Sequence, residues 1–156
     1  MEVTVVSVGK IKEPPVLQGI EAYSRQLDKY CRLNLVEVPD AKAPEHLSDK
    51  EREQVKNLEG QGILKRLKED MYVIALDIKG QMLSSAELAG KIRDLRDKGC
   101  GHLAFVIGGS LGLSREVLGR ADFRLSFGPL TFPHQLMRLM LLEQLCRCFK
   151  HIDGQG

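Results

Sequence analysis

The chain has 156 residues, of which 43% are hydrophobic and 28% are charged, and its formal net charge is +2. This length and composition predict one soluble domain, residues 1–156, with a single core. No apolar run reaches the roughly 18 residues that cross a bilayer, and no signal sequence is recognisable, so we expect a cytoplasmic protein without a membrane partner. The net charge is too small to indicate a nucleic-acid partner by itself.

Hydrophobic patterning predicts strands and helices in alternation. In chain order these are a strand at 3–9, a helix from 14 to about 30, a strand at 33–39, a helix from 48 to about 70, a strand at 72–77, a helix from 84 to 99, a strand at 103–107, a short helix from 114, a strand at 123–127 and a helix from about 133 to 151. Ser48 with Glu51, and Ser84 with Glu87, form capping boxes that start two of these helices. A polar loop containing Pro44 is expected between the second strand and the second helix.

This alternation predicts an α/β fold with a mostly parallel sheet and helices on both faces. Ligands of such sheets bind beyond the carboxyl ends of the strands. The predicted functional edge therefore consists of the loops after Gly9, Asp77, Ile107 and Phe127.

Glycines gather where the fourth strand ends, in the stretch FVIGGSLGLS (105–114). Glycine at such a place indicates a positive φ, or the close approach of a phosphate, another cofactor or another part of the chain. The first strand is not followed by the G-x-G-x-x-G of dinucleotide sites, and no P-loop is present. GGSLG is therefore weak evidence for a phosphate site, and a nucleotide-binding module without catalysis stays open as an alternative.

A second unusual loop, FGPLTFPHQL (127–136), is largely apolar and is stiffened by two prolines. Connecting loops are usually polar and lie on the surface, so this one is predicted to pack inside the protein or against an apolar ligand. The four cysteines have no metal-binding spacing, and we expect reduced thiols and no metal site.

The stretches VSVGK, VPDAKAPE, ALDIKG, FVIGGSLGL, LTFPHQLMR and LLEQLCR resemble the SPOUT class of RNA methyltransferases and, within it, the RlmH (YbeA-like) family. The resemblance implies a trefoil knot in the C-terminal region, which topology rules alone would not predict. It also implies S-adenosylmethionine as cofactor. The implied cofactor-binding residues are Leu76, Gly108, Phe127, Gly128, Pro129, Leu130, Thr131 and Phe132.

The resemblance further implies methylation at N3 of a pseudouridine in large-subunit (23S) ribosomal RNA, on the assembled ribosome and without a metal. Another RNA, such as tRNA, is the alternative substrate. Candidate catalytic residues on the last helix are His134, Glu143 and Arg147, and candidate RNA contacts are Lys10, Arg138 and Arg147. A helix-surface ion pair for Glu143 and Arg147, and a cap or packing role for His134, are the structural alternatives.

The last helix is apolar almost all round, which predicts burial on more than one side and, with the family resemblance, a symmetric homodimer. Members of the family end in a short tail with Tyr-His and a basic residue, whereas this sequence ends in HIDGQG. For the chain as given, we expect cofactor binding with impaired methyl transfer.

Overall fold

The computed structural model describes residues 1–41 and 46–154. Within them the chain forms, in order, β1 (Glu2–Val8), α1 (Pro14–Leu27), β2 (Arg32–Val38), α2 (Asp49–Leu64), β3 (Tyr72–Met82), α3 (Ser85–Asp97), β4 (His102–Ile107), α4 (Arg115–Arg120), β5 (Phe123–Ser126) and α5 (His134–Ile152). The predicted order of elements is confirmed. Both predicted capping boxes are present at Ser48 and Ser84.

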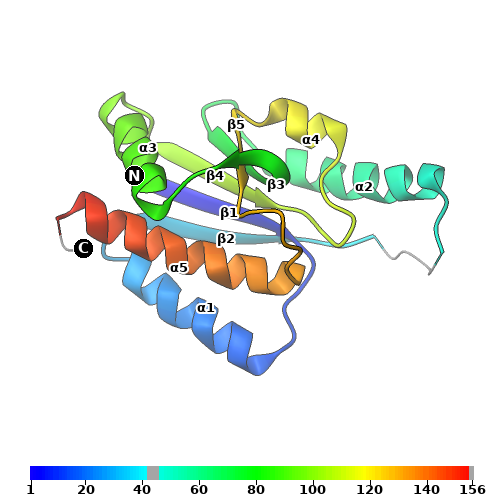
Figure 1. Ribbon diagram of the computed structural model, residues 1–156, viewed down its shortest axis with the longest axis horizontal. Coiled ribbons are helices and arrows are strands. Elements are labelled where there is room, and N and C mark those ends of the chain that lie inside the picture. Colours follow the sequence, from blue (N-terminus) through cyan, green and yellow to red (C-terminus); the bar gives the residue numbers. More distant parts are fainter. Residues whose placement is uncertain (42–45, 155–156) are drawn as a thin grey trace.

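The strands form one sheet in the order β2-β1-β4-β3-β5, and every neighbouring pair is parallel (Figure 1). The prediction of a mostly parallel α/β sheet is therefore confirmed. β1 and β4 lie next to each other inside the sheet, and their residues from Val3 and Leu103 onward are buried. Strands covered on both faces have no polar face, which explains their nearly continuous apolar sequences.

Two hydrophobic cores lie on opposite faces of the sheet. Alternate side chains of β1 divide between them, with Val3 and Val5 in one core and Val6 and Val8 in the other. The first core is closed by α1, α3 and α5, and the second by α2 and α4. Figure 1 shows α5 lying alongside α1 across one face of the sheet, with α2 and α4 together on the other. None of the described helices is long and apolar enough to cross a membrane.

Two boundaries differ from the sequence prediction by more than three residues. α2 ends at Leu64 rather than near residue 70, because Arg66 and Leu67 donate their N–H groups three residues back, to Ile63 and Leu64, in a tight turn toward β3. β3 continues to Met82 rather than ending at Asp77. Pro44, expected in the loop before α2, lies outside the described residues.

Candidate active site

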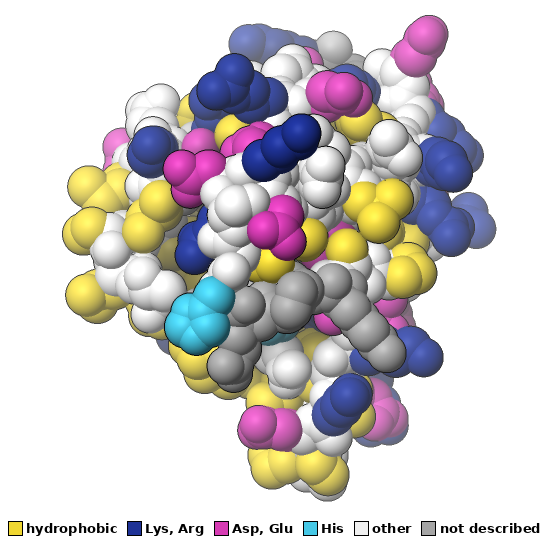
Figure 2. Space-filling model, turned by 90° about the vertical axis from the view of Figure 1, so that its right-hand side faces the viewer, with side chains coloured by type: hydrophobic (Ala, Val, Ile, Leu, Met, Phe, Trp, Pro, Cys, Tyr) yellow, Lys and Arg dark blue, Asp and Glu magenta, His cyan; other side chains and the backbone are white. Residues whose placement is uncertain are grey.

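A cavity of about 670 Å³ lies at the carboxyl ends of β3, β4 and β5. Segments 77–79, 107–113 and 127–132 supply most of its wall, and we call it the cofactor cavity. Figure 2 shows the end of the molecule toward which β1 and β4 run, with hydrophobic side chains gathered on its left and Lys and Arg side chains along its right edge. The predicted functional edge of the sheet therefore carries a cavity.

Glycine is required in the GGSLG turn both for a positive φ and for a close approach of the main chain. Gly112 has φ = +90°, which disfavours any residue with a Cβ, and its N–H donates to the Gly109 carbonyl at 3.1 Å. A Cβ on Gly108 would lie 2.9 Å from the carbonyl carbon of Gly112. The group that approaches Gly108 is therefore the chain itself.

β3 meets β5 in two places. Leu125 of β5 pairs with Leu76 and again with Gln81, and the register shifts between those two pairings. A Cβ on Gly80 would lie 2.6 Å from the Arg124 carbonyl oxygen, so the bulged segment passes directly against the β5 backbone. Only a glycine fits at this crossing without moving the main chain.

Ser126 joins two of the cavity loops. Its hydroxyl donates to the Ile78 carbonyl at 3.0 Å and accepts the N–H of Gly128 at 3.0 Å. The side chain is buried, so neither hydrogen bond competes with bulk water. Ser126 therefore fixes the spacing between the segment around Ile78 and the loop after β5.

Seven of the eight residues expected to bind the cofactor line this cavity: Leu76, Gly108, Phe127, Gly128, Leu130, Thr131 and Phe132. Pro129 is not among the lining residues, although its neighbours on both sides are. Charged side chains also border the cavity, with Asp77 opposed by the cations Lys56, Lys79 and Arg124. The structure thus brings together loops that lie about 50 residues apart in sequence.

The predicted catalytic and RNA-contact residues lie in different environments. His134, at the first position of α5, lines the cofactor cavity. Glu143 and Arg147 form an ion pair four residues apart, with Arg147 64% exposed, and they lie outside the cofactor cavity. Lys10 is exposed in the loop after β1.

Arg138 is placed differently from the predicted RNA contact. It is only 5% exposed. Its guanidinium donates to Glu37 Oε2 at 2.7 Å and to the Gly9 carbonyl at 3.0 Å, and its Nε has no partner among the described residues. Through these two contacts Arg138 ties α5 to the ends of β1 and β2. A buried guanidinium with these partners is not free to bind an RNA phosphate.

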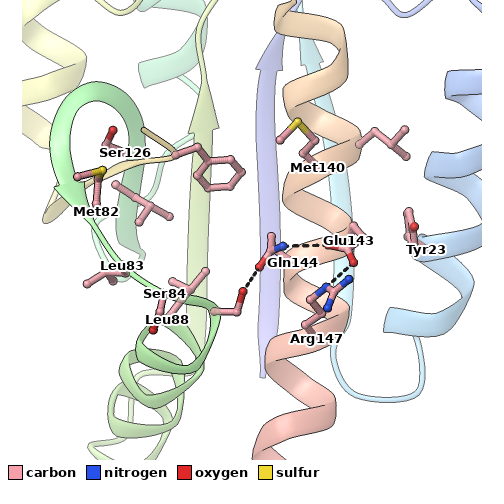
Figure 3. Close-up of a pocket in the computed structure, with 14 residues that line it drawn as sticks. Tyr23, Met82, Leu83, Ser84, Leu88, Ser126, Met140, Glu143, Gln144 and Arg147 are labelled. Atoms are coloured by element: carbon pink, nitrogen blue, oxygen red, sulfur yellow. Dashed lines mark hydrogen bonds and ion pairs between the residues drawn. The ribbon is translucent and has the colours of Figure 1, made fainter. Parts of the chain in front are cut away.

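Glu143 and Arg147 line a second cavity of about 650 Å³, which lies between α1, α3 and α5 and which we call the α5 groove (Figure 3). Met82, Leu83 and Met140 supply apolar walls, and Tyr23 of α1 also lines the groove, on the other side of α5 in Figure 3. Gln144 links α5 to α3, because its amide oxygen accepts a hydrogen bond from Ser85 Oγ across the groove. Its Nε2 donates to Glu143 Oε2 at 3.0 Å on the same helix. Leu125 and Phe127 line both cavities, so the two lie back to back.

The sequence is similar to known methyltransferases over its whole length. The family described as "Predicted SPOUT methyltransferase" matches residues 1–156. Two proteins named "Ribosomal RNA large subunit methyltransferase H" are similar: one from Alkaliphilus oremlandii at 56% identity and one from Clostridioides difficile at 54%. Both alignments cover 99% of this chain and 98% of the relative.

The chain belongs to the SPOUT methyltransferase family. The solved structure of a probable methylase family protein from Haemophilus influenzae has the same fold, with a TM-score of 0.53 at 15% identity, over 98% of this chain and 66% of that one. SPOUT methyltransferases use S-adenosylmethionine as methyl donor.

The cofactor cavity of this SPOUT chain suits that cofactor. Its apolar wall, with Phe127, Leu130 and Phe132, matches an adenine ring and a thioether chain. Asp77 and the cations beside it match an amino acid moiety that carries both charges. No phosphate is present in S-adenosylmethionine, which explains why the cavity has neither a P-loop nor a Rossmann glycine pattern.

The trefoil knot implied by the SPOUT resemblance stays a prediction. The close approach of Gly80 to the Arg124 backbone shows that β3 and β5 pack tightly at the register shift between them. Among the described residues no group of three His, Cys, Asp or Glu side chains could hold a metal, and the four cysteines are free thiols.

Sequence reasoning missed Glu59, a buried carboxylate on α2. A signal was present, because Val55, Glu59 and Ile63 recur every four residues, so that a charge occupies the inward face of the helix. Glu59 lies against Gly109 of the cavity turn, where a Cβ would stand 3.1 Å from its Oε1.

Proposed function

We propose that this protein transfers a methyl group from S-adenosylmethionine to N3 of a pseudouridine in large-subunit (23S) ribosomal RNA, in the cytoplasm and on the assembled ribosome. The names of relatives at 54–56% identity over nearly the full length support the RNA class. The observation that carries the proposal is the convergence of Leu76, Gly108 and five residues of the loop after β5 on one cavity: Phe127, Gly128, Leu130, Thr131 and Phe132.

The cofactor supplies a methyl group that its sulfonium already activates. The protein therefore contributes orientation and exclusion of water more than chemical activation. The apolar walls and the backbone of the 108–112 and 127–132 segments would hold the cofactor, and His134 also lines the cavity. The attacking nitrogen must lose a proton, for which a neighbouring acceptor is needed.

The α5 groove supports a homodimer. Met82 exposes a large apolar surface at the groove, which Leu139 and Met140 also line, and Leu136 of the same helix α5 is an exposed large hydrophobic residue. A second copy that packs on this face would bury them in a symmetric interface. Arg147 would then stand at the dimer interface, oriented by Glu143 and able to meet an RNA phosphate. Exposed Lys10 is a second phosphate contact.

The alternative of a nucleotide-binding module with a phosphate site at GGSLG is disfavoured. The carboxylate of Glu59 lies against Gly109 and would repel a phosphate there. Methylation of tRNA remains the competing proposal within the SPOUT family.

The experiment uses labelled S-adenosylmethionine and three acceptors: ribosomes from a strain that lacks the protein, free ribosomal RNA and bulk tRNA. We expect label in large-subunit RNA only with assembled ribosomes, at the reduced rate predicted for the chain as given, and mapping then gives the base. Label in tRNA would show that tRNA is the substrate in place of ribosomal RNA. Absence of cofactor binding by calorimetry would overturn the proposed methyltransferase activity of this chain. Sedimentation at micromolar concentration tests the dimer, which a monomer would contradict.

A further inference from the structure

Glu59 is buried with half of its hydrogen-bonding capacity unused. Its side chain is 6% exposed. Oε2 accepts the N–H of Ala41 at 3.0 Å, and Oε1 has no partner among the described residues. A buried carboxylate oxygen without a donor is unfavourable, which makes Glu59 a candidate for contact with a bound group that supplies one.

The side chain borders a small cavity of about 430 Å³, which we call the α2 pocket. Asp40, Ser110 and His134 line it with Glu59. Gly109, Ser110 and His134 also line the cofactor cavity, so the two spaces adjoin along the GGSLG turn. Its two carboxylates disfavour a phosphate and favour a ligand that presents N–H donors.

We propose that the α2 pocket seats the target base and that Glu59 Oε1 accepts a hydrogen bond from a ring N–H of that base. The inference rests on the proposed function and names the substrate contact. Pseudouridine carries two ring N–H groups, at N1 and N3, whereas uridine has N3–H alone because its N1 carries the sugar. A carboxylate only accepts, so it matches either group.

The two donors give Glu59 different tasks. A bond from N3–H makes Glu59 the proton acceptor: the N3 proton moves to Oε1 while the N3–methyl bond forms and the methyl–sulfur bond breaks, which leaves a neutral thioether and a protonated Glu59. A bond from N1–H makes Glu59 the residue that separates pseudouridine from uridine.

The surroundings suit a proton acceptor. Burial raises the pKa of Glu59, the Asp40 carboxylate raises that pKa further, and the Ala41 N–H lowers it. The other charged or titratable groups that line the α2 pocket are Asp40 after β2 and His134 at the start of α5. Lys56, one turn earlier on α2, pairs with Glu53 instead. A carboxylate of raised pKa takes a proton more readily than an exposed one.

The test compares Glu59→Gln with Glu116→Gln, an exposed carboxylate of the neighbouring helix α4. For Glu59→Gln we expect kcat/KM for ribosome methylation to fall about 10- to 100-fold, the range for loss of a charge-assisted hydrogen bond. Affinity for S-adenosylmethionine should stay within about threefold, and the melting temperature should stay level or rise because a buried unpaired charge is removed. Glu116→Gln should match the wild type in all three.

Two further arms identify the donor. If N3–H is bound, the wild type loses kcat/KM at acidic pH as Glu59 protonates, and Glu59→Gln lacks that limb. If N1–H is bound, ribosomes with uridine at the target position are poor substrates for the wild type, and Glu59→Gln no longer discriminates. Wild-type rates in Glu59→Gln overturn the inference, and so does a fall in melting temperature with a parallel loss of cofactor affinity, which would make Glu59 a structural anchor.

Failure of the proposed function has a different signature. If the wild type labels no RNA, the pocket is probed by NMR titration of pseudouridine nucleoside with S-adenosylhomocysteine present. Shifts at Gly109 and Ser110 that disappear in Glu59→Gln support the pocket. Absence of shifts in the wild type overturns it.

Discussion

The cofactor cavity is built by loops that lie far apart in sequence, whereas helices α1, α3 and α5 supply most of the lining of the α5 groove. The loops keep their places through contacts between main-chain atoms, at Gly80 and Gly108, and through the hydroxyl of Ser126. The groove depends on helices that the first core already holds. Its polar members Glu143 and Arg147 pair with each other at the surface.

The difference indicates how each region tolerates change. A substitution in the cofactor cavity should lower both the stability of the fold and the affinity for the cofactor. A substitution on the exposed side of the α5 groove should leave the fold intact and alter only what docks there. Measurements that separate stability from activity test this contrast directly.

The largest effect is expected for Gly80→Ala. The new Cβ would lie 2.6 Å from the Arg124 carbonyl oxygen, and main chain has to move to relieve the overlap. We expect a loss of about 2–4 kcal/mol in the free energy of unfolding and at least a tenfold loss of cofactor affinity. Thermal denaturation and calorimetry measure the two.

Gly90→Ala is the matched control, because a Cβ at this position of α3 meets nothing within 4 Å. It should stabilise the protein by about 0.5–1 kcal/mol, as expected for alanine in a helix. Equal stabilities for the two variants would show that the β3–β5 crossing is not tight in solution.

Arg138→Leu is expected to have the next largest effect. The variant leaves the Gly9 carbonyl and Glu37 without their donor, although Glu37 remains 45% exposed and can take up water. We expect a loss of about 2–3 kcal/mol by chemical denaturation. Arg25→Leu, which removes an exposed pair with Glu21, should change stability by less than about 0.5 kcal/mol. A similar loss in both variants would mean that the buried clamp contributes no more than a surface pair.

The sequence predicts local features of this molecule well. The order of strands and helices, the parallel sheet and both capping boxes follow from periodicity and from residues three apart, as at Ser48 and Glu51. The edge that carries the cavity follows from strand direction, since Gly108 and Phe127 both come just after the ends of parallel strands. These signals lie within one element or its immediate neighbour.

Contacts between distant segments could not be predicted in the same way. Nothing near Arg138 in the sequence indicates Glu37 or Gly9 as partners, because they lie 101 and 129 residues away. The meeting of β3 with β5 at Gly80 depends on the path of the whole chain. The contents of the cavity and the knot came from family resemblance, and the roles of the site residues remain proposals.

Ser126→Ala probes the link between the cavity loops. The variant removes the bonds to Ile78 and Gly128, and we expect a loss of about 1–2 kcal/mol together with weaker cofactor binding. Ser24→Ala on α1 is the control, because its hydroxyl makes one bond within its own helix and its loss should be nearly neutral. Wild-type cofactor affinity in Ser126→Ala would show that the loops hold their spacing without this hydroxyl.

Arg147→Ala should have the smallest effect on the fold. Its ion pair with Glu143 is at the surface, so the free energy of unfolding should change by less than about 0.5 kcal/mol, as in the control Arg93→Ala on α3. Affinity for S-adenosylmethionine should be unchanged, because Arg147 lies outside the cofactor cavity. Methylation of ribosomes should nevertheless fall at least about tenfold, the cost of losing one charged contact to phosphate.

Salt dependence separates an RNA contact from a dimer contact at Arg147. An arginine that neutralises one phosphate should lower the slope of log affinity against log salt by about one when it is removed. An unchanged slope with a shifted monomer–dimer equilibrium would assign Arg147 to the subunit interface instead. Either result supports the α5 groove as a docking surface. A large loss of the free energy of unfolding in Arg147→Ala would show instead that the groove, like the cofactor cavity, cannot be changed without destabilising the fold.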